Sequence, residues 1–255
     1  MSDGLFARLR SALEPGTDFT DVLAGAWGAL GPTELARRRV IVGAGRPAAL
    51  GDFFDVTGAG AGRIRFTGDL SGAQRLGADL SEGAVVIDGD VGDDVGLGMA
   101  GGSIEVTGRA GDRAGGAAPE ARRGMSGGEL VVRGSAGTEA GSRMRRGLLV
   151  VGGDVGARAG VGMIAGTIVV LGDAGTSAGL WSKRGSVVAL GPVSIPSTYR
   201  YACTYRPAHL RLILGRARNR YELPLLDHHL SGPYRRYSGD LADLGKGEIL
   251  VWTAS

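Results

Sequence analysis

The chain has 255 residues, of which 48 are glycine and 43% are hydrophobic. The glycines do not follow a Gly-X-Y triplet, which excludes a collagen-like chain, and the apolar fraction is large enough to form a buried core. The formal net charge is only +3, and the single cysteine, Cys203, excludes an internal disulfide and a thiolate cluster for zinc or iron–sulfur.

The N-terminal residues Met1–Gly4 lack the basic-then-apolar pattern of a signal peptide. No apolar run reaches the roughly 18 residues that a membrane-spanning helix needs. A lone cysteine also fits a reducing compartment. We therefore expect a cytoplasmic protein with no membrane partner.

Residues 1–50 are expected to form an N-terminal lead-in and cap. The spacing of Phe6, Leu9 and Leu13 predicts a short helix, whereas the β-branched residues of 39–43 predict a strand.

The glycine-rich run 58–62 resembles a phosphate-binding loop. A nucleotide site requires a helix directly after such a loop, but residues 63–68 read as a strand. We therefore interpret the run as an irregular first turn of the repeat that follows.

A short motif recurs between Gly83 and Gly191, and its clearest copy is residues 166–179. The copies open at successive steps of 19, 26, 19, 19 and 19 residues, and the long step holds an insertion around residues 119–123. A fixed period near 20 residues indicates a stacked architecture. The opening residues are Gly83, Gly102, Gly128, Gly147, Gly166 and Gly185.

The second and fourth residues after each opening glycine are apolar, from Val85 and Ile87 to Val187 and Ala189. This alternation predicts a strand with one buried face. The eighth and twelfth residues are small or β-branched, which suits a narrow interior, and the glycines are expected to permit positive φ at corners. We therefore predict an all-β fold, a parallel β-helix of about 19-residue turns over residues 51–192 with capping segments at both ends.

The third residue after each opening glycine is expected to point outward, and it is valine in five of the six copies. A solvated face would be polar, so a second layer is expected to cover this column. Either the ends of the same chain or another subunit fits that expectation. The column consists of Val86, Glu105, Val131, Val150, Val169 and Val188.

Residues 193–255 follow the repeat and are rich in aromatic and basic side chains. We predict a C-terminal cap and docking tail, because the open end of a stacked sheet needs a cover. Leu210, Ile213 and Leu214 have the spacing of a short amphipathic helix, and 247–252 reads as a last strand.

No catalytic constellation stands out, so no catalytic residue and no metal site are expected. His228 and His229 are adjacent, which on a strand directs their rings to opposite sides, and His209 is remote in sequence. No nucleophile elbow and no His-Glu-x-x-His motif occurs.

Basic residues gather just before the opening glycines and in the insertion. Equivalent corners two turns apart are about 10 Å from each other, so these charges are expected to form a ladder. Such a ladder suits an acidic partner or a polyanion, although solvated corner charges explain it as well. Nucleic acid is disfavoured because no aromatic residues interleave with the charges. The candidate site residues are Arg122, Arg123, Arg143, Arg145, Arg146, Lys183 and Arg184.

The repeat, with Met99, Met144 and Met163 at its sixteenth position, closely resembles the C subunit of formylmethanofuran dehydrogenase. That subunit shares its repeat with the C-terminal domain of the large subunit of glutamate synthase. The tail segments 237–240 and 245–249 look like the C-subunit version. The Arg- and Ala-rich character resembles the C subunit of the methylotroph formyltransferase/hydrolase complex, and the resemblance covers about residues 50–255.

The resemblance implies a right-handed parallel β-helix that acts as a non-catalytic scaffold in a hetero-oligomer. The expected partners are an amidohydrolase-like subunit, a formyltransferase subunit and a further subunit. Such a complex moves a formyl group from formyl-tetrahydromethanopterin to a methanofuran-type carrier and releases formate. No cofactor is expected to bind this chain directly, except that the basic corners are hypothesised to attract the carrier's glutamate-rich tail.

Three alternatives remain. The chain fits a subunit of a molybdenum or tungsten formylmethanofuran dehydrogenase. It also fits a glutamate-synthase-type domain, which the lack of a fused amidotransferase or flavin domain disfavours. An independent β-helical carbohydrate enzyme is disfavoured because the acidic residues are scattered and only one asparagine, Asn219, is present.

Overall fold

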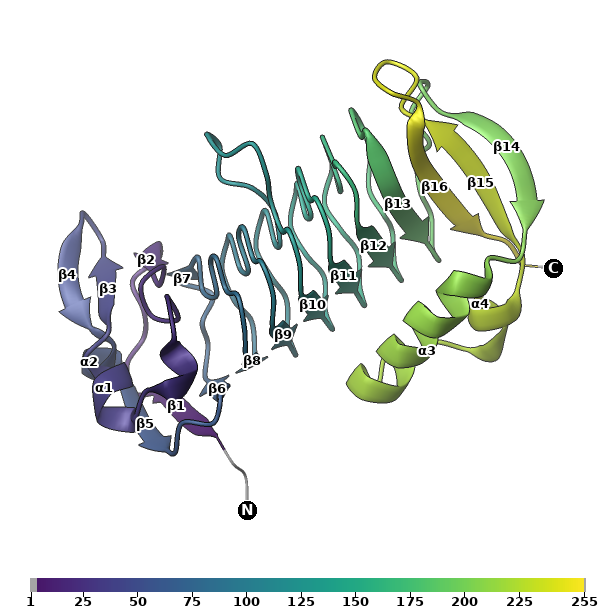
Figure 1. The fold of residues 1–255 in the computed structure, drawn as a ribbon. Coiled ribbons are helices and arrows are strands. Elements are labelled where there is room, and N and C mark those ends of the chain that lie inside the picture. The colour runs from purple at the N-terminus through teal and green to yellow at the C-terminus, as the bar shows by residue number, and fades with distance from the viewer. Residues whose placement is uncertain (1–3, 255) are drawn as a thin grey trace.

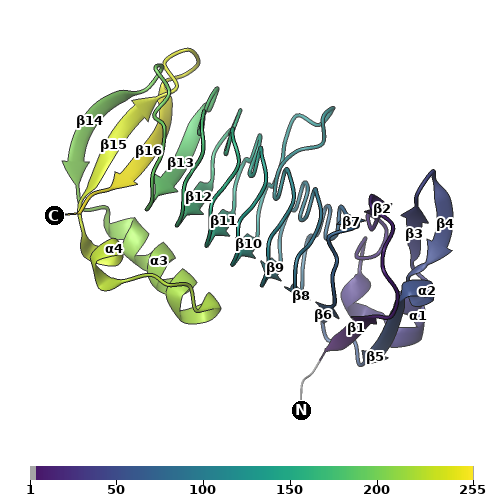
Figure 2. The ribbon, with the colours of Figure 1, turned by 180° about the vertical axis from the view of Figure 1, so that it is seen from behind.

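A row of stacked turns dominates the molecule, with a group of strands and helices at each end (Figure 1). The computed structural model describes residues 4–254. Met1–Asp3, which belong to the segment that lacks a signal-peptide pattern, lie outside the described residues, as does Ser255. Seen from behind, the same row shows helices α3 and α4 below the strands and the insertion between β9 and β10 above them (Figure 2).

Each copy of the repeat contributes one short parallel strand to the long sheet. The strands pair in register, so Val85 lies opposite Ile104, and Leu149 lies opposite Ile168. The second and fourth positions of all six copies are buried, as predicted. The strands of the six copies are β8 (Ala84–Asp88), β9 (Ser103–Val106), β10 (Glu129–Val132), β11 (Leu148–Val151), β12 (Thr167–Val170) and β13 (Arg184–Ala189). β6 (Arg63–Thr67) precedes the first copy and pairs in parallel with β8.

The opening glycines have the backbone conformation that the sequence predicts. All six have positive φ, from 70° at Gly102 to 104° at Gly166. A Cβ atom on Gly147 would lie 2.8 Å from the carbonyl oxygen of Gly128. Another residue at this corner would therefore meet both an unfavourable backbone conformation and a steric clash.

The N-terminal residues form part of the long sheet and a second, small sheet. β1 pairs in parallel with β6 and antiparallel with β5, and the small sheet has the order β4-β3-β2-β7. The elements are β1 (Leu5–Leu9), β2 (Thr17–Asp18), the 3-10 helix η1 (Trp27–Ala29), α1 (Pro32–Ala36), β3 (Arg39–Val42), β4 (Arg46–Ala49), α2 (Leu50–Phe53), β5 (Phe54–Gly58) and β7 (Ala73–Gln74).

The helix expected around Phe6 and Leu9 is wrong, because this segment is strand β1. Its short apolar run fits the spacing of a helix as well as the alternation of a strand. Pairing with two neighbouring strands, β5 and β6, buries Leu5 and Ala7 on one face of β1. The strand predicted over residues 39–43 is confirmed as β3.

The C-terminal residues add three strands and two helices to the β13 end of the long sheet. β16 extends the parallel row beside β13, and β15 and β14 add antiparallel strands beyond it. The helix predicted from Leu210 and the final strand are confirmed. The elements are β14 (Arg200–Tyr205), α3 (Ala208–Tyr221), α4 (Asp227–Ser231), β15 (Tyr234–Gly239) and β16 (Lys246–Trp252).

The expectation of an all-β, right-handed parallel β-helix is wrong. The described residues form a mixed, mostly parallel sheet of 12 strands and a second sheet of 4 strands, with helices packed against them, which is an α/β-like arrangement. The eighth positions of the repeat meet only through isolated bridges, such as Val91 with Ala110 and Ala136 with Val155. A glycine follows each of these four positions, and the pairing there does not extend to neighbouring residues.

The chain's own helix α3 covers the outward column from Val131 to Val188, so the own-chain alternative is correct for these four valines, whereas Val86 lies outside this cover and is half-buried. Val131, Val150, Val169 and Val188 are fully buried and pack in one cluster with the apolar face of α3. Figure 1 shows α3 lying along β10–β13. The helix side of this cluster consists of Leu210, Leu214, Ala217 and Tyr221.

The C-terminal tail is also tied to the last turn of the repeat by buried polar groups. The Asp240 carboxylate accepts hydrogen bonds from the backbone N–H groups of Trp181 (2.8 Å) and Ala242 (2.9 Å). The Tyr199 hydroxyl donates to the carbonyl of Gly179 at 2.8 Å and lies 2.6 Å from the Ser182 hydroxyl. Burial raises the pKa of Tyr199 to about 12, and the negative charge of Asp240 adds to this shift.

Replacing Leu214 with alanine should test whether α3 is a structural layer. We expect Leu214→Ala to lower the free energy of unfolding by about 2–5 kcal/mol, because the side chain is fully buried against the valine column. The matched control is Leu212→Ala on the same helix, whose side chain is 77% exposed and whose loss should change stability by less than about 0.5 kcal/mol. Urea unfolding followed by circular dichroism gives both values, and equal losses would contradict the assignment.

The buried Tyr199 hydroxyl should make the protein sensitive to alkali. The folded state holds this proton more tightly than the unfolded chain, whose tyrosine pKa is about 10. The stability that Tyr199 contributes is therefore present below pH 10 and is lost as the pH rises towards its folded pKa of about 12. Tyr199→Phe should flatten the fall in stability over this window, whereas Tyr201→Phe, at an exposed ring, should not. Identical alkaline unfolding curves for the wild type and Tyr199→Phe would refute this.

Candidate functional site

The seven basic residues predicted as a site all lie at the surface. Six of them are exposed and Arg145 is half-buried. Within residues 4–254, no carboxylate forms an ion pair with any of the seven. Their charge is therefore available to a partner.

Two pairs of these residues occupy equivalent corners of the repeat. The backbone N–H groups of Arg145 and Lys183 donate to the carbonyls of Met125 and Met163, each at 2.8 Å and each one turn earlier. Arg146 lies two residues before β11, and Arg184 is the first residue of β13, which is two steps away from β11 in the sheet. Neighbouring strands are about 4.8 Å apart, so the two corners are separated by about 10 Å.

Lys246 extends this corner and was missed by sequence reasoning. It pairs with Arg184 across β13 and β16, and it precedes Gly247 as Arg184 precedes Gly185. The basic residue followed by glycine was a signal that the sequence offered, but Gly247 lies 62 positions after Gly185, outside the regular steps of 19 residues.

Arg143 and the insertion form a separate group. The Arg143 guanidinium donates hydrogen bonds to the carbonyls of Pro119 (2.9 Å) and Ala121 (2.7 Å). The insertion, which carries the exposed Arg122 and Arg123, projects from the row on the side away from α3 (Figures 1 and 2). Arg143 thus shapes the backbone that presents the other two charges.

A cleft of about 330 Å³ lies beside the insertion. Arg143, Arg158 and the exposed Trp181 line it, together with Arg113 and Glu139. Arg158 pairs with Glu139 at 2.7 Å, and Arg113 pairs with the buried Asp94 at 2.7 Å, which raises the pKa of Arg113. These pairs leave Arg143 and the indole ring of Trp181 as the groups most open to a ligand.

A larger groove of about 620 Å³ runs between α3 and the starts of the parallel strands. Its buried carboxylate, Glu129, accepts hydrogen bonds from Arg216 and from the Tyr221 hydroxyl, both at 2.8 Å. Burial and the adjacent carboxylate raise the pKa of Tyr221, and the hydrogen bond to Glu129 raises that of Arg216. Glu129 therefore binds α3 to the sheet and is already occupied by structural partners.

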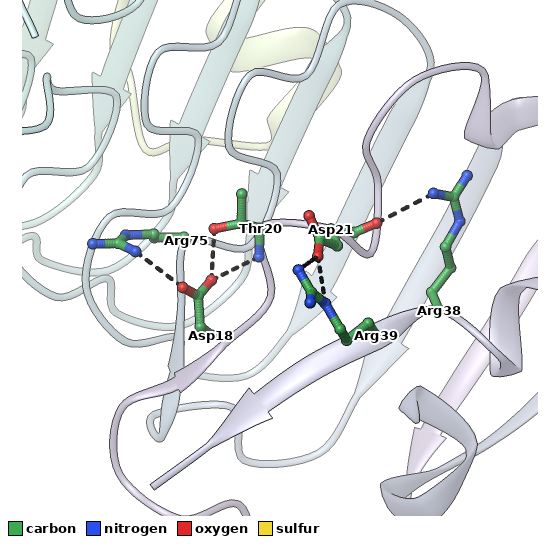
Figure 3. A network of polar contacts seen from close by, with 6 residues as sticks. All are labelled: Asp18, Thr20, Asp21, Arg38, Arg39 and Arg75. Carbon is green, nitrogen blue, oxygen red and sulfur yellow. Dashed lines mark hydrogen bonds and ion pairs between the residues drawn. The ribbon is translucent and has the colours of Figure 1, made fainter. Parts of the chain in front are cut away.

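The N-terminal end carries a polar network that joins β2 and the residues after it to β3 and to Arg75, which directly follows β7 (Figure 3). Asp18 accepts hydrogen bonds from the Thr20 hydroxyl at 2.6 Å and from Arg75 at 2.9 Å. Asp21 pairs with Arg39 at 2.7 Å, and its carbonyl accepts a longer bond from Arg38 at 3.4 Å. These contacts connect the lead-in to the first turn of the repeat.

His228 and His229 make contacts within the C-terminal region, whereas Cys203 is exposed to solvent. His228 stacks on Trp252 with ring centroids 5.0 Å apart, and the His229 Nδ1 atom accepts a hydrogen bond from the Leu226 N–H group. Burial lowers the pKa of His229, and the neighbouring His228 adds to this effect. In the part of the chain that the structure describes, no three His, Cys, Asp or Glu side chains gather as a metal site.

No family model matches the chain, and a search of the curated proteins also found no match. None of the helices within residues 4–254 has the length and apolar character needed to cross a membrane.

The solved structures do include a relative. The chain is similar to a chain of the formyltransferase/hydrolase complex (FhcABCD) from Methylorubrum extorquens, whose crystal structure was determined in complex with methylofuran. The two share 33% sequence identity and superpose with a TM-score of 0.80. The match covers 98% of this chain and 100% of the other. A likeness of this identity along both whole chains shows that the protein belongs to the family of formyltransferase/hydrolase complex subunits.

Proposed function

We propose that this chain is a non-catalytic scaffold subunit, of the C-subunit type, in a formyltransferase/hydrolase complex. The observation that carries the proposal is the match to the FhcABCD complex over the full length of both chains. The complex would move a formyl group from formyl-tetrahydromethanopterin to a methanofuran-type carrier and release formate. The solved relative is a formyltransferase/hydrolase, which favours this version over a molybdenum or tungsten dehydrogenase.

Two acidic side chains that line the grooves beside α3 are both engaged by other side chains, which supports a scaffold role. Glu129 is held by Arg216 and Tyr221, and Glu105 is held by Arg133 at 2.6 Å. A general acid or base must reach its substrate within hydrogen-bond distance. Both carboxylates are occupied by contacts within the chain, so they stabilise the fold rather than act on a substrate. The chain then provides a surface on which the partners assemble, an amidohydrolase-like and a formyltransferase subunit among them.

The basic corners give the scaffold a second role in this proposal, which is to attract the anionic tail of the carrier. Arg145, Arg146, Lys183 and Arg184 lie at equivalent corners about 10 Å apart, and Lys246 continues the row. An array of like charges raises the local concentration of an anion and speeds its encounter. Each corner charge lacks an ion-pair partner among the described residues and so remains available to the tail.

Native mass spectrometry of the purified assembly should test the scaffold role. We expect this chain to co-purify with the other subunits and to release no formate by itself. A monomeric chain that catalyses formyl transfer or hydrolysis alone would overturn the proposal.

Reversing the charge of one corner should test the carrier hypothesis. We expect Arg145→Glu with Arg146→Glu to raise the KM for the carrier by roughly 3- to 10-fold while the complex still assembles, because steering by the corner is lost. The gap from the wild type should narrow at high ionic strength, where exposed charges are screened. Steady-state kinetics and size-exclusion chromatography measure these effects.

The matched control for this experiment is Arg37→Glu with Arg235→Glu. Both arginines are exposed, and the pair makes the same change in net charge away from the corners. The control should keep the wild-type KM. If the corner variant keeps it too, or if the control raises it equally, the corners do not guide the carrier.

A further inference from the structure

The outward column of the sheet continues beyond the part that α3 covers. Glu105 lies opposite Val131, and Val86, Arg65 and Phe6 follow in register across β8, β6 and β1. We call these four residues, Phe6, Arg65, Val86 and Glu105, the N-terminal sheet face. It belongs to the same side of the same sheet as the buried valines.

Helix α3, which covers the outward valines of β10–β13, ends where the N-terminal sheet face begins. α3 ends at Tyr221, which is bonded to Glu129 on β10, and Glu222 after it has a positive φ of 53°. Arg133 marks this boundary, because it pairs with Glu222 at 3.5 Å and with Glu105 at 2.6 Å. In Figures 1 and 2, α3 lies under the strands from β10 onwards and away from β8 and β6.

The N-terminal sheet face is the floor of a groove of about 680 Å³. Phe6 and Val86 on this floor are half-buried, although the equivalent Val131 and Val150 are fully buried under α3. The end of α3, with Arg220 and Tyr221, forms one wall. The floor of the groove therefore alternates the apolar side chains of Phe6 and Val86 with the ion-paired Arg65 and Glu105, and within residues 4–254 no helix covers it.

The charges around the groove indicate what its occupant carries. Arg65 is neutralised by Asp88 at 2.6 Å, and Glu105 by Arg133. Arg63 and Arg220 are exposed at the groove, and within residues 4–254 neither has a carboxylate partner. Arg220 instead lies over the ring of Tyr221, 5.3 Å from its centroid. The unbalanced charge on this face is positive.

We propose that the N-terminal sheet face binds an acidic amphipathic helix of another subunit of the complex, an inference that rests on the proposed function. The face spans three steps between strands, about 14 Å, which two to three turns of helix cover. Apolar residues of that helix would pack on Phe6 and Val86, and its carboxylates would pair with Arg63 and Arg220. A second copy of this chain is a poor occupant, because it would bring the same arginines together.

A photo-crosslinking amino acid at Val86 should identify the occupant in the assembled complex. We expect the crosslink to join an acidic, helical peptide of a different subunit. A crosslink to a second copy of this chain, or none to any subunit, would overturn the proposal. Hydroxyl-radical footprinting of the unmodified protein provides an independent measurement, because Phe6 should be oxidised in the free chain and protected in the complex.

Charge reversal should weaken this contact specifically. We expect Arg63→Glu with Arg220→Glu to lower the affinity of the chain for the remaining subunits by roughly tenfold, because two ion pairs become repulsive. The control is Arg206→Glu with Arg211→Glu, which reverses two exposed arginines at the other end of the α3 region and should leave affinity within about twofold. Equal losses for both variants, or no loss for the first, would count against the face.

The results separate this inference from the proposed function. If the wild-type chain does not co-purify with the other subunits, the proposed function is wrong. If it does co-purify but Val86 stays uncrosslinked and Phe6 stays unprotected, the complex uses other surfaces and only the docking inference is wrong.

Discussion

The register between the parallel strands is the constraint on which the rest of the structure depends. Residues at one position of the repeat lie opposite each other from strand to strand, as Val85, Ile104 and Leu130 do. A slip of one residue would turn every buried side chain outward. The opening glycines help to hold this register, since a side chain at Gly147 would collide with the backbone of the preceding turn.

Because of this register, residues of one kind at one repeat position lie side by side along the sheet. Apolar residues at the outward position become a continuous apolar strip, and such a strip needs a second layer. α3 supplies that layer for the half of the sheet that begins at β10. Glu129 begins the covered half, and its buried carboxylate is tolerated because Arg216 and Tyr221 compensate for its desolvation. The same repetition brings the basic residues Arg146, Arg184 and Lys246 to one edge of the sheet, at β11, β13 and β16.

Much of the fold and part of the site were predictable from local patterns. The alternation in each copy predicted the strands and their buried residues, and the spacing of Leu210 and Leu214 predicted α3. The equivalence of Arg145 and Lys183 followed from the period alone. Patterns this local did not show that Arg143 binds the carbonyls of the insertion or that Lys246 joins the basic corner. They also led to the wrong fold class, because a period inside the repeat says nothing of the antiparallel strands and helices at the two ends.

The sequence by itself determined the repeat, the division of its positions into buried and outward, and the glycine corners. These are properties of consecutive residues, which dihedral preferences and hydrophobic periodicity decide. Only the tertiary structure decided that β1 is a strand, that α3 rather than another subunit covers four of the five outward valines, and that this cover ends before Glu105. Those outcomes depend on contacts between segments far apart in the chain, such as Tyr221 with Glu129, and packing rather than local preference selects them.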